Sequence, residues 1–550
     1  MVNLSSEIKK QTSDFFAAAP KQNALAILVI LLFVTHNIFA LQNLSITDDE
    51  DKHLLYGVLI LEGNSDRFSD SKMPVSVWNA IPQKIATFLP DGGVKDLLNE
   101  LNTARAMTVL FSGVVAYVVF LFSRQMFGIV PAFISLFLYL IDPNLMAHSQ
   151  LVTTDTYAVG MILISVYCLW RFANKRTWKN GLICAFALAI SQIVKYTAVV
   201  LFPIFLLVLV IYDLRAILDL INKNQVKKIF GMIFRYGVYI GVAGIITLLI
   251  INIGFLFNHY SRFGNYQFRS PLFQGLQTNF PILNRVPVPI AYPYLEGLDW
   301  VTENDRTGTG YGNLYLLGET QRGERFPGYF IVASILKVPL GIQAIIIFAF
   351  LSYLANKKKR EKFIVNEMFL LVPVLFFVIY LNFFFNTQIG IRYYLVIFPL
   401  LYVFAGSLFA NWQDVSTGKK YSILLLLIYI SVSVFSYYPY YLSYFNELVW
   451  NRRTTYKYLA DSNLDWGHEE IALEQYLSLH PDATVNPNSM EPGLFVVSAN
   501  RLVGVKGSDL TYAWLRENFE PIDTIAYGYF VYQITDSEFD AFCVTTNYCK

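Results

Sequence analysis

Two neighbouring stretches, ALAILVILLFVTHNIFAL (24–41) and ITDDEDKHLLYG (46–57), decide the fold of this chain. The first is a mainly apolar run, close to the ~20 residues that a helix needs to cross a bilayer. The second places four acidic residues in a row at positions 48–51. Acidic residues beside an apolar span usually form a solvated loop, so the rest of the sequence must decide whether these have another task.

The composition is that of a membrane protein. The 550 residues are 55% hydrophobic and only 15% charged, with a mean hydropathy of +0.44, whereas soluble domains carry about 25% charged residues. Apolar runs fall at 24–42, 106–123, 128–141, 154–171, 180–196, 198–214, 234–257, 339–355, 367–385, 392–410 and 421–440. They predict an α-helical polytopic membrane protein with about eleven transmembrane helices. The net charge of +2 leaves no excess for nucleic-acid binding.

The basic residues predict the orientation of these spans. They precede the first run and return in every second loop, most densely in KKKREK (357–362). Basic loops stay cytoplasmic, which places the N-terminus inside and, after an odd number of spans, the C-terminus outside. The expected location is therefore the cytoplasmic (inner) membrane, with loops 43–104 and 258–338 and the tail on its extracytoplasmic, periplasmic face. The first run is too long for the core of a signal peptide, so we expect a retained helix.

The tail differs in character from the rest of the chain. Its patterned segments are helix-like IALEQYLSL (471–479) and strand-like FVVSA (495–499) and YFVYQI (529–534). They predict a small α/β domain. We therefore divide the chain into a transmembrane domain, 1–441, and an extracytoplasmic C-terminal domain, 442–550. Cys543 and Cys549 lie in this polar tail and can pair in an oxidising compartment, but the sequence does not decide whether they do.

Charged residues gather at the outer ends of the predicted spans. Asp155, in HSQLVTTDTYA, begins the run 154–171 on the same face as the acids at 48–51; its simpler explanation is a helix N-cap. The basic residues at this face are Arg105, Lys195, Lys337 and Arg392. A charge at the centre of a membrane helix costs about 2.5–3.5 kcal/mol, so these charges need a partner or a task, although a single one can snorkel to the headgroups. Together they fit a site that binds an anionic headgroup beside carboxylates.

Several of these residues lie in motifs whose order resembles the C-type (GT-C) glycosyltransferases, specifically bacterial relatives of the protein O-mannosyltransferases and of the lipid A aminoarabinose transferase. The motifs are Asp49-Glu50 with His53 and Gly57, LVTTDTYA (151–158), Lys195, IGIRYYLVIFPL (389–400), YPYYLSYFNEL (438–448) and LADSNLDWGHEE (459–470). The resemblance covers nearly the whole chain. Two departures are a single proline in SKMPVSVW (71–78), where many relatives have two, and an acidic run longer than the usual pair. The position of His53 favours Asp49 over Asp48 as the matching acid.

The resemblance implies an inverting transferase that moves a sugar from a polyprenyl monophosphate to a hydroxyl group outside the cytoplasm. On this basis Asp49 is the base, while Glu50 and Asp155 orient it, hold the acceptor or share a divalent ion. The residues expected to bind the donor phosphate are Lys195, Arg392, Arg105 and Lys337. His53 and Asp465 are further site candidates. No cofactor besides that ion is expected; the partners are the lipid donor, membrane lipids and an acceptor protein, lipid or surface glycan.

Two other functions are compatible with the same pattern. A multi-pass transporter would place its charges near the bilayer midplane, whereas those of this chain fall at the outer ends of the runs. A glycan polymerase or ligase that uses a lipid-pyrophosphate donor would need the same geometry, and only the donor chemistry would separate it. The sequence does not specify the sugar, the acceptor, the metal dependence or the oligomeric state.

Reporter fusions test the predicted topology. A fusion at Lys359 is expected to score cytoplasmic and one after Lys550 extracytoplasmic, because basic loops alternate with the outer loops along the chain. The measurement is alkaline phosphatase activity against fluorescence of a cytoplasmic reporter at each position. Finding both positions on one side would contradict the topology and the placement of the charged residues on one face.

Overall fold

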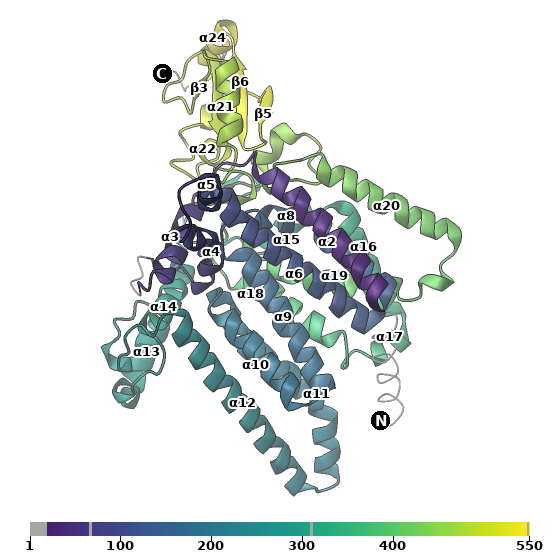
Figure 1. Ribbon diagram of the computed structural model, residues 1–550. Helices are drawn as coiled ribbons and strands as arrows, with labels where there is room; N and C mark the ends of the chain where they lie inside the picture. The colour runs from purple at the N-terminus through teal and green to yellow at the C-terminus, as the bar shows by residue number, and fades with distance from the viewer. Residues whose placement is uncertain (1–18, 65–68, 309–311, 547–548, 550) are drawn as a thin grey trace.

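The computed structural model describes residues 19–64, 69–308, 312–546 and 549. Most of this chain is a bundle of long helices, with a small α/β unit at one end (Figure 1). The helices on the predicted apolar runs are α2 (Ala19–Leu41), α6 (Leu101–Phe127), α7 (Ile129–Ile141), α9 (Asp155–Asn174), α10 (Trp178–Gln192), α11 (Leu201–Asn222), α12 (Val226–Gly254), α16 (Leu340–Ala355), α18 (Met368–Phe383), α19 (Phe398–Gly406) and α20 (Thr417–Phe435). The predicted α-helical membrane fold is confirmed.

The number of full spans is smaller than the eleven predicted. In the described residues, seven segments are long and apolar enough to cross a membrane, or nine if each bent pair counts as one span. Helices α10 and α18, with 15 and 16 residues, are shorter than a spanning helix requires. The bent pairs are α7 with α8 (Pro143–Ser149), at 63°, and α15 (Tyr329–Lys337) with α16, at 116°. A proline stands at each break, where its ring interrupts the helix.

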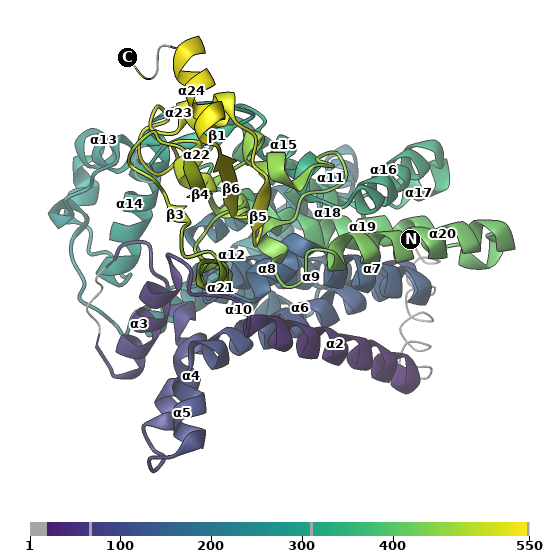
Figure 2. The ribbon, with the colours of Figure 1, turned by 90° about the horizontal axis from the view of Figure 1, so that it is seen from above.

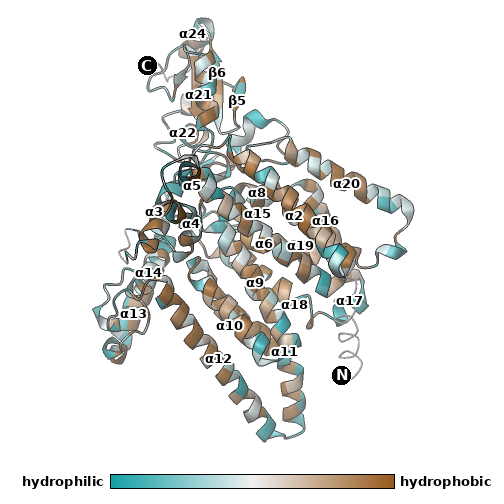
Figure 3. Cartoon of the chain, viewed as in Figure 1, coloured by the Kyte–Doolittle hydropathy of each residue, from teal (hydrophilic) through white to brown (hydrophobic). Residues whose placement is uncertain are grey.

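Helix α9 lies at the centre of the bundle. Its apolar window is 83% buried, whereas those of α12 and α20 are 17% and 11% buried. Viewed from above, α9 lies between α6 and α18 (Figure 2). Helices α12 and α20 run along the outside and present mostly hydrophobic residues there (Figure 3), as expected of helices that face lipid. The central helix therefore carries its first residue, Asp155, to a buried position at one end of the bundle.

Short elements gather at that end. They are α3 (Glu50–Leu61), η1 (Pro74–Ser76), α4 (Val77–Ala86), α5 (Gly93–Asn99), η3 (Phe263–Asn265), α13 (Pro271–Asn279), η4 (Pro281–Arg285), α14 (Tyr292–Thr307) and the hairpin of β1 (Leu314–Leu316) and β2 (Glu319–Gln321). The basic helix α17 (Lys357–Glu361) lies at the opposite end, near the beginning of α2 (Figure 1). The two long polar loops and the tail thus share one end of the bundle.

The tail contains the predicted small α/β unit. Its strands are β3 (Thr484–Val485), β4 (Gly493–Ser498), β5 (Asp523–Ile525) and β6 (Tyr529–Ile534), and its helices are α21 (Glu470–Leu479), α22 (Ala499–Leu502), α23 (Ala513–Asn518) and α24 (Asp536–Thr545). The sheet order is β3-β4-β6-β5, with β3 parallel to β4 and the other pairs antiparallel. A disulfide joins Cys543 to Cys549, a pairing that the sequence left open.

Candidate active site

A partly exposed carboxylate between two less exposed cations forms the centre of the site. Asp49 stands directly before α3, and its Oδ2 lies 3.1 Å from Nη1 of Arg392. Its Oδ1 lies 3.7 Å from Nζ of Lys72. The side chain of Asp49 is 31% exposed, compared with 11% for Arg392 and 6% for Lys72. The carboxylate is therefore accessible while the cations beside it are fixed by their surroundings.

A second ion pair lies beside the first. Asp155, the first residue of α9, pairs with Lys195, which follows α10. The ammonium group of Lys195 lies 4.2 Å from the centre of the Tyr393 ring, and the guanidinium of Arg392 lies 5.6 Å from the same ring. The N-cap of α9 is Thr154, not Asp155. Asp155 therefore serves as an ion-pair partner at a helix N-terminus, where a negative charge is favourable.

The cations control the protonation of Asp49. Burial opposes ionisation of this carboxyl, but the charges of Arg392 and Lys72 outweigh it and hold its pKa at about 2. Burial, then the charge of Lys72, lowers the pKa of His53 to about 3. At neutral pH Asp49 is thus ionised and His53 is a neutral imidazole, with Nδ1 3.4 Å from Oγ of Ser76.

Glu50 and Arg105 form a fully buried pair that departs from the expected roles. Nε and Nη2 of Arg105 donate to Oε1 and Oε2 of Glu50 at 2.8 and 2.6 Å. The remaining N–H groups of Arg105 reach the carbonyls of Leu44 and Ser45 and the Asn102 side chain. Glu50 also accepts the N–H of Val152 at 2.9 Å. Because an arginine has five N–H donors and all are used, Arg105 has none left for a phosphate, and Glu50 has a structural role.

Lys337 is likewise engaged away from the Asp49 carboxylate. Its Nζ donates to the carbonyl of Leu442 at 2.6 Å and to the carbonyl of Asn463, and the side chain is almost completely buried. These contacts join the end of α15 to the beginning of the tail. They indicate that Lys337 anchors the tail rather than binding the donor, in contrast to the role expected from the sequence.

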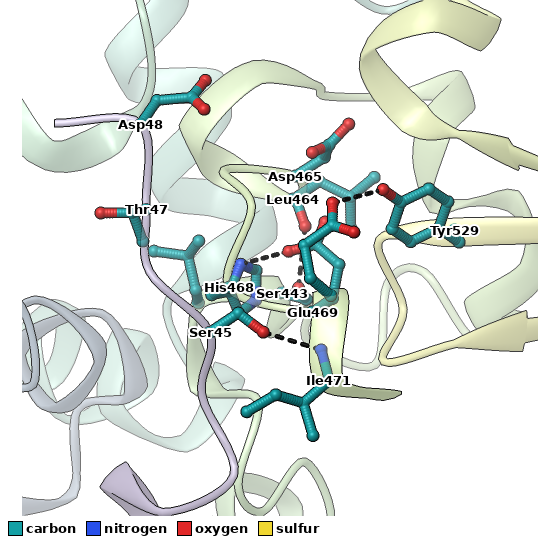
Figure 4. A network of polar contacts seen from close by, with 12 residues as sticks. Ser45, Thr47, Asp48, Ser443, Leu464, Asp465, His468, Glu469, Ile471 and Tyr529 are labelled. Atoms are coloured by element: carbon teal, nitrogen blue, oxygen red, sulfur yellow. Dashed lines mark hydrogen bonds and ion pairs between the residues drawn. The ribbon is translucent and has the colours of Figure 1, made fainter. Parts of the chain in front are cut away.

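The tail lies directly against the acidic run. The N–H of Ser45 donates to the carbonyl of His468 at 3.0 Å, and the N–H of Asp48 donates to the carbonyl of Trp466 at 3.3 Å. The hydroxyl of Ser45 accepts the N–H of Ile471 at 2.7 Å (Figure 4). The Trp466 ring also lies 4.5 Å from the guanidinium of Arg392. Residues of the tail therefore form one wall beside Asp49 and Arg392.

The other two acids of the run stay at the surface. Asp48 is about half exposed and pairs with Lys506 of the tail at 2.8 Å. Asp51 is exposed, and its Oδ1 accepts the N–H of Lys52. The four adjacent acids thus have three environments: a buried structural pair, a partly exposed carboxylate between cations, and solvent.

Asp465 belongs to a buried group behind the acidic run. Its Oδ2 accepts the N–H of Asn500 at 3.0 Å, and the neighbouring Glu469 lies 2.6 Å from Nδ1 of His468 (Figure 4). Burial raises the pKa of Asp465 and of Glu469 to about 8 in each case. Both acids therefore keep a proton at neutral pH and hold the tail together as neutral groups.

The site does not fit a divalent ion. In the parts of the chain that the structure describes, no three His, Cys, Asp or Glu side chains converge as metal ligands would. Asp49 and Asp155 are each already paired with cationic side chains, and Glu50 is paired with Arg105. A metal would have to replace these partners, so we assign it no role.

Three residues of the site were missed in the sequence: Lys72, Tyr393 and Trp466. Lys72 is one of four lysines in loop 43–104, without a pattern that would distinguish it from the others. Tyr393 and Trp466 lie inside the quoted motifs, but one more aromatic residue among many carries no signal. Only the fold brings them next to Arg392.

Part of the chain matches a known protein family. Residues 97–234 match the family described as dolichyl-phosphate-mannose-protein mannosyltransferase. This part of the chain is similar to that family. It spans about a quarter of the chain and contains Asp155 and Lys195. The predicted resemblance to GT-C glycosyltransferases is thereby confirmed, and no curated protein matches the chain.

Two solved structures resemble the chain at low sequence identity. ArnT from Cupriavidus metallidurans bound to undecaprenyl phosphate has a TM-score of 0.48 and 10% identity, over 94% of this chain and 99% of that chain. The oligosaccharyltransferase AglB from Archaeoglobus fulgidus, in complex with an inhibitory peptide and a dolichol-phosphate, has a TM-score of 0.46 and 12% identity, over 74% of this chain and 54% of that chain.

The buried pair can be tested by its effect on stability. Arg105→Ala is expected to destabilise the protein by about 3–5 kcal/mol, because it leaves the charge of Glu50 buried without a partner. Lys457→Ala is the control: it breaks an exposed ion pair with Glu520 and should cost no more than ~1 kcal/mol. Thermal unfolding of each purified variant in detergent is the measurement. Unchanged stability of Arg105→Ala with weaker donor binding would restore Arg105 as a phosphate ligand.

Proposed function

We propose that this protein is an inverting glycosyltransferase that moves a sugar from a polyprenyl monophosphate to an extracytoplasmic hydroxyl group. The observation that carries the proposal is the accessible Asp49 carboxylate held between Arg392 and Lys72. A carboxylate and cations side by side supply both a proton acceptor and a site for an anionic leaving group. The description of the family matched by residues 97–234 names a dolichyl phosphate donor, in agreement with this chemistry.

The cations are the proposed site for the donor phosphate. Arg392 uses Nη1 on Asp49, while its buried Nε has no hydrogen-bond partner among the described residues. An unpaired buried donor is costly in a folded protein, so Nε of Arg392 is a natural contact for a phosphate oxygen. Lys72 lies beside Asp49, and Lys195 lies over the Tyr393 ring that Arg392 also contacts. Both lysines would add positive charge to the phosphate site. Together these residues stabilise the negative charge that forms on the departing phosphate.

Asp49 is the proposed base, and donor binding would activate it. With a pKa of about 2, the free carboxylate is a weak base, because an efficient base has a pKa near the working pH. A phosphate bound to Arg392 and Lys72 would neutralise the two charges that lower this pKa. The carboxyl would then become more basic only when the donor is present, which favours transfer over unproductive proton uptake.

The transfer itself is a single displacement. The acceptor oxygen forms a bond to the anomeric carbon as the bond from that carbon to the phosphate oxygen breaks. The electron pair of the broken bond leaves with the polyprenyl phosphate, and the hydroxyl proton goes to Asp49. Because the attack occurs opposite the leaving group, the anomeric configuration inverts. Asp155 would hold Lys195 in position through its ion pair.

The proposed orientation places the site outside the cytoplasm. The tail, both long polar loops and the Asp49 group share one end of the bundle, opposite the basic helix α17. Basic segments favour the cytoplasmic side, and the Cys543–Cys549 disulfide is stable in oxidising compartments. The charged residues lie at helix ends. A transporter would instead need them near the bilayer midplane. We propose the tail as an extracytoplasmic domain that completes the site.

The decisive experiment is a turnover assay. Purified protein is incubated with polyprenyl-phosphate sugars, and released polyprenyl phosphate is measured; a parallel incubation uses a polyprenyl-pyrophosphate sugar. Release from the monophosphate alone supports the proposal. Release from the pyrophosphate alone would indicate a polymerase or ligase, and release from neither, in the presence of acceptor lipids and proteins from the membrane, would contradict a transferase.

Replacement of Asp49 tests the base. Asp49→Asn keeps the size of the side chain but cannot accept the proton, so turnover should fall by about 10²–10⁴. Asp48→Asn is the matched control. The carboxylate of Asp48 pairs with Lys506 at the surface, so this substitution should leave turnover unchanged. Turnover is measured on purified variants that elute as a single species. Wild-type activity of Asp49→Asn would rule out this mechanism.

Replacement of Arg392 tests the phosphate site. Arg392→Ala should weaken donor binding at least about tenfold, because hydrogen bonds to charged groups contribute about 1.5–3 kcal/mol. Arg392→Lys should restore binding only in part, since lysine lacks the planar guanidinium that also stacks on Trp466. Donor affinity can be followed by tryptophan fluorescence. The control is Arg269→Ala, a half-exposed arginine paired with Asp70; normal donor binding by Arg392→Ala would leave Arg392 a structural residue.

A further inference from the structure

An apolar groove lies along the outermost helix, away from the Asp49 group. It has a volume of about 670 Å³ and is lined mainly by α20, including Leu424, Ile428 and Val432, with Phe137 of α7 on the other side. Helix α20 stands along the outside of the bundle (Figure 1) and presents hydrophobic residues there (Figure 3). The groove is thus an open, lipid-facing hollow.

A second hollow, rich in arginine and aromatic residues, adjoins the end of this groove. It has a volume of about 690 Å³, and its lining includes Trp450, Arg452, Arg453 and Tyr527. Nη2 of Arg452 donates to Oγ of Ser436 at 2.6 Å, and Ser436 itself lines the apolar groove. A hydrogen bond therefore joins the linings of the two hollows.

Their positions along α20 match the layers of a bilayer. Because α20 is long and apolar enough to span, the groove lies at the depth of the acyl chains. The helix ends at Phe435, so Arg452 and Arg453 lie at the level of the lipid headgroups. Trp450 is 87% exposed beside them, as is typical of the aromatic residues that anchor membrane proteins at this level.

Arg453 has N–H donors to spare, whereas Arg452 already donates to Ser436 and Tyr527. Arg452 is held between the rings of Tyr437 and Tyr527, at 4.0 and 5.2 Å, which orients its guanidinium. Among the described residues, the side chain of Arg453 donates one hydrogen bond, from Nη1 to the carbonyl of Ile522 at 3.0 Å, which leaves most of its five donors available. The acid in this lining is Asp523, so the positive charge is in excess.

We propose that the groove and the arginine hollow together bind one anionic glycerophospholipid. An acyl chain would occupy the groove of α20 and α7, and the phosphate would contact Arg452 and Arg453, whose guanidinium groups suit bidentate phosphate recognition. The charge complementarity and the Arg452–Ser436 contact between the two linings carry the proposal. It is independent of the transferase reaction, because none of these residues belongs to the Asp49 group.

Lipid titration of the purified full-length chain tests the proposal. Detergent-solubilised protein is titrated with phosphatidylglycerol or phosphatidylcholine, and bound lipid is counted by native mass spectrometry. Wild type should prefer phosphatidylglycerol, and Arg453→Gln should weaken that binding about fivefold, the effect of one basic residue near a membrane surface. Ser431→Trp, which fills the groove without changing the arginines, should weaken binding of both lipids.

Controls separate this site from general affinity for anions. Lys457→Gln removes a charge from the same short helix, η10 (Arg452–Lys457), but its side chain pairs with Glu520, so binding should not change. Glycerol 3-phosphate should fail to compete, because it lacks the acyl chains. Equal binding of the two lipids by wild type, equal loss in Lys457→Gln and Arg453→Gln, no effect of Ser431→Trp, or full competition by glycerol 3-phosphate would each overturn the proposal. Donor turnover is not part of this readout.

Discussion

The buried ion pair between Glu50 and Arg105 is the interaction on which the site depends. It joins the beginning of α3 to α6, and through Glu50 and the N–H of Val152 it reaches the segment before α9. An ion pair removed from water is tolerable only when all its polar atoms are satisfied, and here the carbonyls of Leu44 and Ser45 complete the set. This requirement fixes the path of the chain on both sides of the pair.

Asp49 gains its position from that pair. Since Glu50 is held inward, the preceding residue is placed at the start of α3, next to Arg392 and Lys72. Two adjacent acids therefore have different roles. Glu50 is buried in an ion pair that stabilises the fold, and Asp49 remains accessible. The central position of α9 supplies the second carboxylate, Asp155, at the same end of the bundle.

Much of this arrangement was predictable from the sequence, because it depends on apolar length and on the sign of charge. The helices, the small α/β unit and the placement of the acidic run, Asp155, Lys195 and Arg392 at one end followed from these patterns. The choice of Asp49 within the run came from the family resemblance. The roles of Arg105 and Lys337 did not. Their distances to partners decide whether their donors are used, and such distances depend on contacts between residues far apart in the chain. The contribution of Lys72 could not be predicted for the same reason. The number of full spans is lower than predicted because some helices are broken or short.

The contact between the acidic run and the tail has a consequence for biogenesis. Ser45 and Asp48 receive their backbone partners from Trp466 and His468, more than 400 positions later in the order of synthesis. The wall beside Asp49 therefore does not exist while the earlier helices are being inserted. A nascent chain would hold the acid and the arginine but lack the surface that encloses them. Completion of the site therefore depends on the synthesis of residues 466–471 and not on the insertion of the earlier helices alone.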